Sequence, residues 1–486
     1  MKYCLFIITC ILLLCQFTFA QDTLWLRRLD MGNDEIANGI AYRENKIAIA
    51  GYRFNGSNDD FLVVKCDRQG ETLWTRIFDL GFDECAIDAG IDGEGNILAT
   101  GYIFSYRGLK FEIRKSKFGI RKQSFDQELS ALAINYDSAG EIKWQRIEPN
   151  KVGTGIVASN AGYYYITGSS FTGYGYDFWI GRYDRNGETL WSRTYDFTIY
   201  DIGYRSAIDR EGNIVMAGFL GDGYNFDCIL LKFNPEGDTI FTRFFDLSLF
   251  DYGVGIATDQ ANNIVIGGLT GDTLNTDYLI LKYDSDGNLL WSRTYSQAKE
   301  EEVLGVSCDN DNNIFVTGVS GEMYLYDYLT IKYDPAGNVL WTATYDNGSD
   351  DEGGDVACDD NGNPIVTGAS FGTTSYDFLT IKYRGELGIQ EPQSHFRNSK
   401  FKIQNLKVSV HSSISRTDFI FYAPFSGYFN LELYNASGKR ERLIHSGYLN
   451  QGIHKYSLNG LNSGVHFIKI SSQGGNSTIQ KLILIK

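Results

Sequence analysis

Short apolar runs alternate with polar turns along most of the chain and predict β-strands rather than helices. The clearest stretch contains the runs LWSRTY (290–295), GVSC (305–308), IFVTG (314–318) and DYLTIKY (327–333). Turn signals rich in Asp, Asn and Gly separate these runs, as between the strands of antiparallel sheets. The pattern predicts an all-β protein with four short strands in each stretch of about 50 residues.

The four-strand pattern recurs, and an aromatic residue near the start of one strand marks each copy. The markers are Trp25, Trp74, Trp144, Trp191, Phe241, Trp291 and Trp341. Such spacing is typical of the four-stranded blades of a β-propeller. A single blade cannot bury both of its faces, so the copies are expected to form a ring.

The two ends of the repeat region predict how the ring closes. The repeats begin with an outer strand at 24–26 and stop after a third strand at 378–383, so the two together complete one blade. This register favours a seven-bladed β-propeller over residues 21–385. Residues 1–20 have the apolar run and small-residue end of a secretory signal peptide. No later run is long and apolar enough to predict a membrane-spanning helix.

The repeat resembles a known bacterial family. The pattern DYxTIKYDxxGNxLWxxxY followed by AxDxxGNxxVTG is similar to the SBBP-type β-propeller repeat over about residues 22–385, and matches best in the last four copies. The resemblance implies the propeller fold and assigns no activity.

The sequence pattern changes after a polar linker at 386–400. Residues 401–486 alternate apolar and polar positions and predict a small C-terminal β-sandwich. The segments LYNASGK (433–439), GIHKYSLNGLNSGVHFIKI (452–470) and KLILIK (481–486) resemble the sorting domain of the bacterial type IX secretion system. The resemblance implies recognition by the secretion machinery and a secreted or surface-attached protein in a bacterium with an outer membrane.

Charge and histidine placement exclude several kinds of function. The formal net charge is −16, whereas residues 395–486 carry 12 Lys and Arg against 3 Asp and Glu. The propeller is therefore strongly acidic and ill suited to nucleic acid. All five histidines lie at 395 or later, which argues against His-metal sites and Ser-His-Asp triads in the propeller. A carboxylate-dependent polysaccharide lyase or glycosidase in the central pocket remains an alternative.

Repeated carboxylates predict a possible binding face. One stands ten residues after the aromatic marker in six copies, with Thr154 in the third; a second set opens the third strands. The first set would ring one mouth of the channel and attract Ca²⁺ or a cationic partner. The alternative is that each carboxylate caps backbone N–H groups. The first set comprises Glu35, Glu84, Asp201, Asp251, Glu301 and Asp351; the second comprises Asp60, Asp177, Asp227, Asp277, Asp327 and Asp377.

The second copy breaks the symmetry with a basic insertion at about 103–128, which includes Arg114, Lys115 and Lys117. We expect it on the carboxylate face, where Tyr176 and Tyr326 could stack on a ligand. The sequence thus favours a non-catalytic extracellular propeller that binds a protein or glycan through its loop face. The carboxylate enzyme and a structural spacer are the alternatives.

Overall fold

The computed structural model of this protein contains two compact units, Met1–Gly388 and Ile389–Lys486. It describes residues 23–106, 127–322 and 325–385, and then 408–413, 416–423, 427–435, 439–449, 452–457, 464–472 and 477–484. The described residues contain strands and turns, as predicted, and no helix that could cross a membrane.

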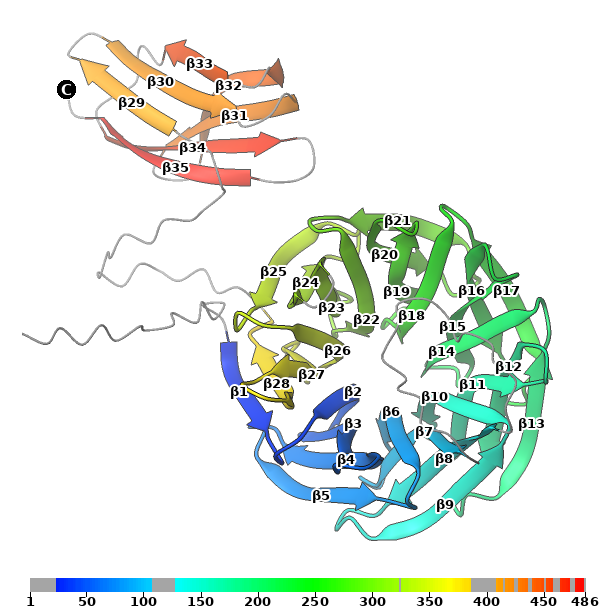
Figure 1. Ribbon diagram of the computed structural model, residues 1–486. Coiled ribbons are helices and arrows are strands. Elements are labelled where there is room, and N and C mark those ends of the chain that lie inside the picture. Colours follow the sequence, from blue (N-terminus) through cyan, green and yellow to red (C-terminus); the bar gives the residue numbers. More distant parts are fainter. Residues whose placement is uncertain are drawn as a thin grey trace, which may run out of the picture. The chain divides into compact units, whose positions relative to one another are not determined.

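Strand pairing groups the described strands of the first unit into seven four-stranded blades arranged in a ring (Figure 1). In each blade the order runs from the channel outward. The blades are β2–β5 (Glu35–Arg43, Lys46–Phe54, Asp59–Asp67, Thr72–Phe78), β6–β9 (Asp83–Ile91, Ile97–Tyr106, Gln127–Tyr136, Ile142–Pro149), β10–β13 (Lys151–Ala158, Tyr164–Phe171, Tyr176–Tyr183, Thr189–Tyr195), β14–β17 (Tyr200–Ile208, Ile214–Gly221, Phe226–Phe233, Thr239–Phe245), β18–β21 (Phe250–Thr258, Ile264–Gly271, Thr276–Tyr283, Leu289–Tyr295), β22–β25 (Glu300–Cys308, Ile314–Glu322, Leu325–Tyr333, Val339–Tyr345), and β26–β28 (Asp351–Cys358, Pro364–Phe371, Tyr376–Tyr383) with β1 (Thr23–Leu29).

The predicted ring closure is confirmed by the pairing of β1 with β28. Trp25 lies opposite Lys382, the same register in which Trp291 lies opposite Lys282 within a single blade. The last blade therefore takes its outer strand from the start of the chain. This closure covers the edge of β28, which would otherwise be exposed in a blade of three strands.

The Asp-rich turns form as the sequence predicted. Asp284 accepts hydrogen bonds from the backbone N–H groups of Asp286 (3.0 Å) and Asn288 (2.8 Å), and Gly287 adopts a φ of 80°. A side chain with a Cβ is strained in that left-handed conformation, so glycine suits the position. These turns lie at one face of the ring, called here the turn face. The opposite face, called the mouth face, carries the other connections of each blade.

The outer tryptophans join neighbouring blades. Trp291 Nε1 donates to Pro335 O of the next blade at 3.2 Å, and a Cβ added at Gly337 would lie 3.1 Å from the Trp291 ring. Between the blades the second and third strands bury an aliphatic core that includes Ile280 and Val316. The ring is rigid because each blade is packed against two others.

The second unit contains two sheets among its described residues. One sheet has the order β29-β30-β33, and the other β32-β31-β34-β35. Their bounds are β29 Val408–Ser413, β30 Arg416–Ala423, β31 Gly427–Asn435, β32 Arg440–Leu449, β33 Gly452–Ser457, β34 Gly464–Ser472 and β35 Ser477–Leu484. Leu431, Leu433 and Ile468 are fully buried. The unit is therefore all-β, as predicted.

Candidate functional site

Each innermost strand contains a break in pairing register, one residue long in six strands and two residues long in β14, where it also includes Arg205, and the first residue of each break lines the channel. These residues are Asn38, Ile87, Thr154, Tyr204, Val254, Leu304 and Gly354. The following residue of each strand forms a second level, made of Gly39, Asp88, Gly155, Arg205, Gly255, Gly305 and Asp355. A Cβ added at Gly305 would lie 2.5 Å from Asp355 Cα, so adjacent strands touch at this level. Glycine in four strands leaves room for one long side chain.

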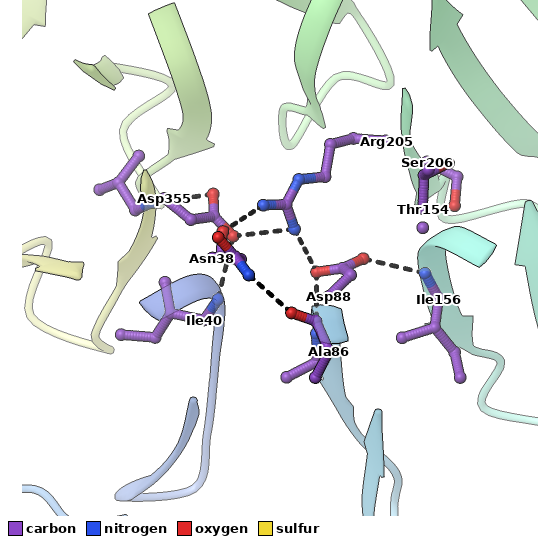
Figure 2. Close-up of polar contacts among 12 residues, drawn as sticks. Asn38, Ile40, Ala86, Asp88, Thr154, Ile156, Arg205, Ser206 and Asp355 are labelled. Carbon is purple, nitrogen blue, oxygen red and sulfur yellow. Dashed lines mark hydrogen bonds and ion pairs between the residues drawn. The ribbon is translucent and has the colours of Figure 1, made fainter. Parts of the chain in front are cut away.

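Arg205 occupies that room and reaches across the channel (Figure 2). Its Nη1 lies 2.5 Å from Asp88 Oδ1 and 3.3 Å from Asp355 Oδ2, and its Nη2 donates to Asn38 O. One side chain of β14 thereby binds to β6, β26 and β2. This cluster was not predicted from the sequence, although Arg205 and the two aspartates depart from the glycine found at the same position in four blades.

Backbone N–H groups complete the cluster. Asp88 accepts from Ala89 N and Ile156 N, both at 2.9 Å, and Asp355 accepts from Val356 N at 2.8 Å and Ile40 N at 3.0 Å. Burial raises the pKa of Asp88, and it raises the pKa of Asp355 to about 6, although Arg205 opposes both shifts. A close, asymmetric carboxylate pair is what the enzyme alternative requires. All four oxygens are already bonded, however, so the pair braces the ring.

Two cavities adjoin this cluster, and Arg205 lines both. The cavity toward the mouth face measures 180 Å³, and its lining includes the seven residues named above at the breaks in pairing register. The one toward the turn face measures 790 Å³ and is called here the funnel. Its lining continues through Ile40, Ile156 and Ile256 to Arg43 and Arg210 at the ends of the innermost strands. The larger opening is thus on the face opposite to the one predicted.

The six mouth carboxylates are not an exposed ring, and the prediction that they form one is wrong. Their side chains belong to residues that are 0 or 1% exposed: Glu35, Glu84, Asp201, Asp251, Glu301 and Asp351. Each accepts a backbone N–H from the loop before it, as Asp251 does from Leu247 (2.6 Å) and Ser248 (2.8 Å). The capping alternative is the correct one, because these loops need acceptors for their buried N–H groups.

The third blade departs from this pattern in a different way from the one expected. Lys151, not Thr154, occupies the carboxylate position, because Lys151 pairs with Ser170 as Asp351 pairs with Ser370. The loop before it is shorter than in the other blades. Lys151 Nζ lies 3.0 Å from Glu148 and 4.8 Å from the centre of the Trp179 ring, so the position keeps a local partner.

Burial raises the pKa of the capping carboxylates. The pKa of Glu84 rises to about 7 and that of Asp351 to about 6; in both cases desolvation is the main cause. Burial also raises the pKa of Asp201. These groups are costly to ionise where they stand, and this affects the pH dependence of stability.

The Ca²⁺ site expected from the sequence corresponds to groups of neighbouring carboxylates that do not specify a metal. Three groups of carboxylates in the described residues have oxygens within 4.8 Å of one another: Asp30, Glu35 and Asp377; Asp60, Asp79 and Glu84; and Asp177, Asp196 and Asp201. In the first, Arg28 already lies 2.6 Å from Asp377, and in the second, Arg53 lies 3.0 Å from Asp60. We therefore assign no cation to them.

The remaining predicted site residues divide between described and undescribed parts. Arg114, Lys115 and Lys117 lie outside the described residues. Tyr326 donates its hydroxyl to Glu300 Oε2 at 2.5 Å and its N–H to Asp350 at 2.9 Å. Tyr176 is half-buried, with its ring 5.4 Å from Phe171. Both predicted stacking tyrosines therefore contact neighbouring loops and are not open platforms.

The most exposed apolar side chains of the mouth face lie in three successive blades, although Leu80 and Phe82 in the loop entering β6 and Leu325 of β24 are also 42 to 65% exposed. Tyr174 is 84% exposed, Tyr224 82% and Leu274 75%, at equivalent positions in three successive blades. The loops entering β14 and β18 add Phe197, Ile199, Leu247 and Leu249, which are 41 to 59% exposed. These seven residues are called here the apolar arc. The same positions in the first and last blades hold Ser57 and Thr374, so the symmetry is broken.

On the rest of the mouth face, carboxylates occupy a repeat position that holds an aromatic residue beside the apolar arc. The residue before the capping carboxylate is Tyr200 or Phe250 beside the apolar arc. It is a carboxylate in four other blades, where it is Asp34, Asp83, Glu300 or Asp350. With Asp59 these four form what is called here the acidic arc. Burial and the neighbouring Asp83 and Asp34 raise the pKa of Asp59 to about 6.

Comparisons with known proteins concern the fold. No protein-family model and no curated protein matches the chain. Among solved structures it is similar to Sqt1 of Chaetomium thermophilum, with 11% identity and a TM-score of 0.43 over 74% of this chain and 97% of Sqt1. A PL25 ulvan lyase gives 11% identity and a TM-score of 0.42 over 74% of this chain and 96% of the lyase. We base no functional argument on these similarities.

Proposed function

We propose that this protein is a non-catalytic binding propeller whose mouth face binds a polypeptide that presents apolar and basic side chains. The apolar arc is the observation that carries the proposal. Solvent-exposed Tyr, Phe, Leu and Ile on adjacent loops are expected at protein interfaces, and the concentration of the most exposed ones, Tyr174, Tyr224 and Leu274, in three successive blades departs from the structural repeat.

The negative charge beside the apolar arc indicates the charge expected of the partner. The acidic arc adjoins the apolar arc on a chain of net charge −16, so basic groups flanking an apolar segment complement both. An anionic membrane or acidic polysaccharide would be repelled by the same carboxylates. A neutral glycan would find few polar groups beside Leu247, Leu249 and Leu274.

The first prediction concerns the apolar arc. Peptides selected from a displayed random library against the full chain should be enriched in Leu or Phe together with Lys or Arg. The double variant Tyr224→Ser, Leu274→Ser should weaken their binding at least about tenfold, because it removes two exposed anchors worth roughly 1 kcal/mol or more each. Isothermal titration calorimetry measures the change.

The control for this experiment is Leu290→Ser, which removes a half-exposed leucine from outer strand β21. Peptide affinity should be unchanged in that variant. Selected peptides that bind the double variant as tightly as the unmodified chain would exclude the apolar arc as the site. Retention of neutral glycans on an array, insensitive to the double variant, would indicate a glycan receptor instead.

The proposal includes export. Residues 1–20 would act as a signal peptide and residues 401–486 as a type IX sorting domain, which rests on the sequence segments quoted above. Residues 401–486 fused behind a periplasmic reporter should carry it to the outer surface of a bacterium that has this system. A strain lacking the secretion channel should keep the reporter inside, as measured by protease accessibility on intact cells. Surface exposure in both strains would refute this part of the proposal.

A further inference from the structure

The funnel is a built cavity at the centre of the ring, on the face opposite to the apolar arc. It measures 790 Å³, and innermost strands of all seven blades supply its lining. The buried cluster of Arg205, Asp88 and Asp355 closes its inner end. A volume of this size accommodates a small organic molecule or the last residues of a peptide.

Apolar side chains line part of the funnel, although more of its exposed lining is polar than apolar. Immediately beyond Arg205 come Ile40, Ile156, Ile256, Val306 and Val356, which are 2 to 7% exposed. Farther out the half-buried residues Tyr42, Val157, Ala158 and Ile208 also line the cavity. This mixed lining favours an amphipathic ligand, with a small apolar body beside polar groups.

The available charge in the lining is positive. Asp88 and Asp355 are the only lining carboxylates, and both are bonded to Arg205 and to backbone N–H groups. Arg43 lies 4.0 Å from Glu44, a weak exposed pair. Arg210 is exposed and makes no ion pair within the described part of the chain. The funnel therefore presents two arginines on opposite parts of an otherwise acidic ring.

Neutral polar groups surround these arginines. Tyr42 donates its hydroxyl to Asp360 Oδ2 at 3.0 Å, and Gln260 Nε2 donates to Asn310 Oδ1 at 3.1 Å. Such bonds hold the rim side chains in place around the opening. Asn160, which also lines the funnel, offers an amide beside Arg210 and Gln260 in the ring of turns.

We infer that the funnel binds an amphipathic monoanion, with its apolar body against the Ile and Val wall and its carboxylate at Arg210. Arg43 adds positive potential at the same opening. Two sources have this chemistry: a free aliphatic carboxylic acid and the C-terminus of a peptide that ends in an apolar residue. The inference does not depend on the proposed function, because the apolar arc lies on the other face.

Titration of the full chain with two probes tests the inference. The probes are hexanoate and N-acetyl-valyl-leucine, each followed by calorimetry and by chemical-shift changes at Ile208 and Ala158. We expect saturable binding of at least one probe. The amide of the same probe should bind at least about tenfold more weakly, because a charge-assisted hydrogen bond to Arg210 is lost. The tighter-binding probe identifies the natural source.

Variants locate the site. Arg210→Gln should weaken binding of the acid about tenfold and leave binding of the amide unchanged. Arg193→Gln, an exposed arginine of outer strand β13 paired with Asp238, is the matched control and should have no effect. Tyr224→Ser, Leu274→Ser should also have no effect, which separates this inference from the proposed function. The absence of saturable binding by either probe, or equal binding by Arg210→Gln, would overturn it.

Discussion

Arg205→Met should destabilise the propeller by about 3–5 kcal/mol, the usual cost of removing one partner from a buried ionic cluster. Asp88 and Asp355 would keep their backbone hydrogen bonds but lose the only cation within reach in the described residues. Methionine fills most of the space left by the arginine stem, so loss of charge accounts for most of the effect. Thermal unfolding at pH 8, followed by circular dichroism, measures it.

Two comparisons separate a charge effect from a packing effect. Arg193→Met breaks an exposed pair with Asp238 and should cost less than about 1 kcal/mol. For Arg205→Met itself, the loss should be smaller at pH 5 than at pH 8, because a protonated Asp355 no longer needs a counter-ion. A loss that is equal at the two pH values would show that the cluster contributes through packing alone.

The expected size of this effect follows from where the cluster lies. β1 and β28 close the ring at its outer edge, whereas Arg205 joins β14 to β2, β6 and β26 at its centre. The β1–β28 pairing and the Arg205 cluster both act on the junction between the first and last blades. A propeller whose terminal blade is assembled from both ends of the chain gains most from a contact there.

The repeat predicted the blades because it reports features that every copy must share. Trp291, the turn at 284–288 and the small residues of the innermost strand recur since each blade meets the same neighbours. Counting along the chain then placed β1 beside β28. The count failed only at the third blade, where a shorter loop moved the capping position from Thr154 to Lys151.

The same regularity left the role of the repeated carboxylates open between ligand binding and capping. Glu84 and Asp251 recur because every loop needs an acceptor, and a sequence alone does not distinguish a buried cap from an exposed ligand. The informative residues are departures from the pattern. Arg205 stands where Gly255 and Gly305 stand in the next two blades, and Leu249 stands where Ser349 stands two blades later. Comparing the seven copies at each repeat position, and noting the residues that differ, would have found both the Arg205 cluster and the apolar arc.

The propeller should be more stable near pH 5 than near pH 8, contrary to common acid denaturation. Burial raises the pKa of Glu84 to about 7 and of Asp351 and Asp355 to about 6, whereas the unfolded chain has ordinary values near 4. At pH 8 these groups are ionised in both states, and burial penalises the folded one. As the pH falls from 8 toward 5, the folded state takes up the protons first, so the free energy of unfolding rises.

The rise should stop near pH 4, where the unfolded chain also becomes protonated. Below that, stability should fall, because Asp92 and Asp359 have lowered pKa values through hydrogen bonds from Asn96 and from Lys382 and Asn363 that outweigh their burial. Glu84 alone can contribute up to about 3 kcal/mol, since one pKa unit corresponds to about 1.4 kcal/mol. Melting temperatures between pH 3 and pH 9 should therefore peak between pH 4 and pH 5.

Glu84→Gln assigns the effect to one residue. Glutamine keeps an oxygen to accept the Phe82 N–H, now 3.2 Å from Glu84 Oε1, and carries no charge. The variant should melt at a higher temperature than the unmodified chain at pH 8 and at about the same temperature at pH 5. Glu141→Gln, which changes a largely exposed carboxylate, should change neither value. If Glu84→Gln lowered the melting temperature at pH 8, the charge on Glu84 would be stabilising, and the assignment of the rise to this buried carboxylate would fail.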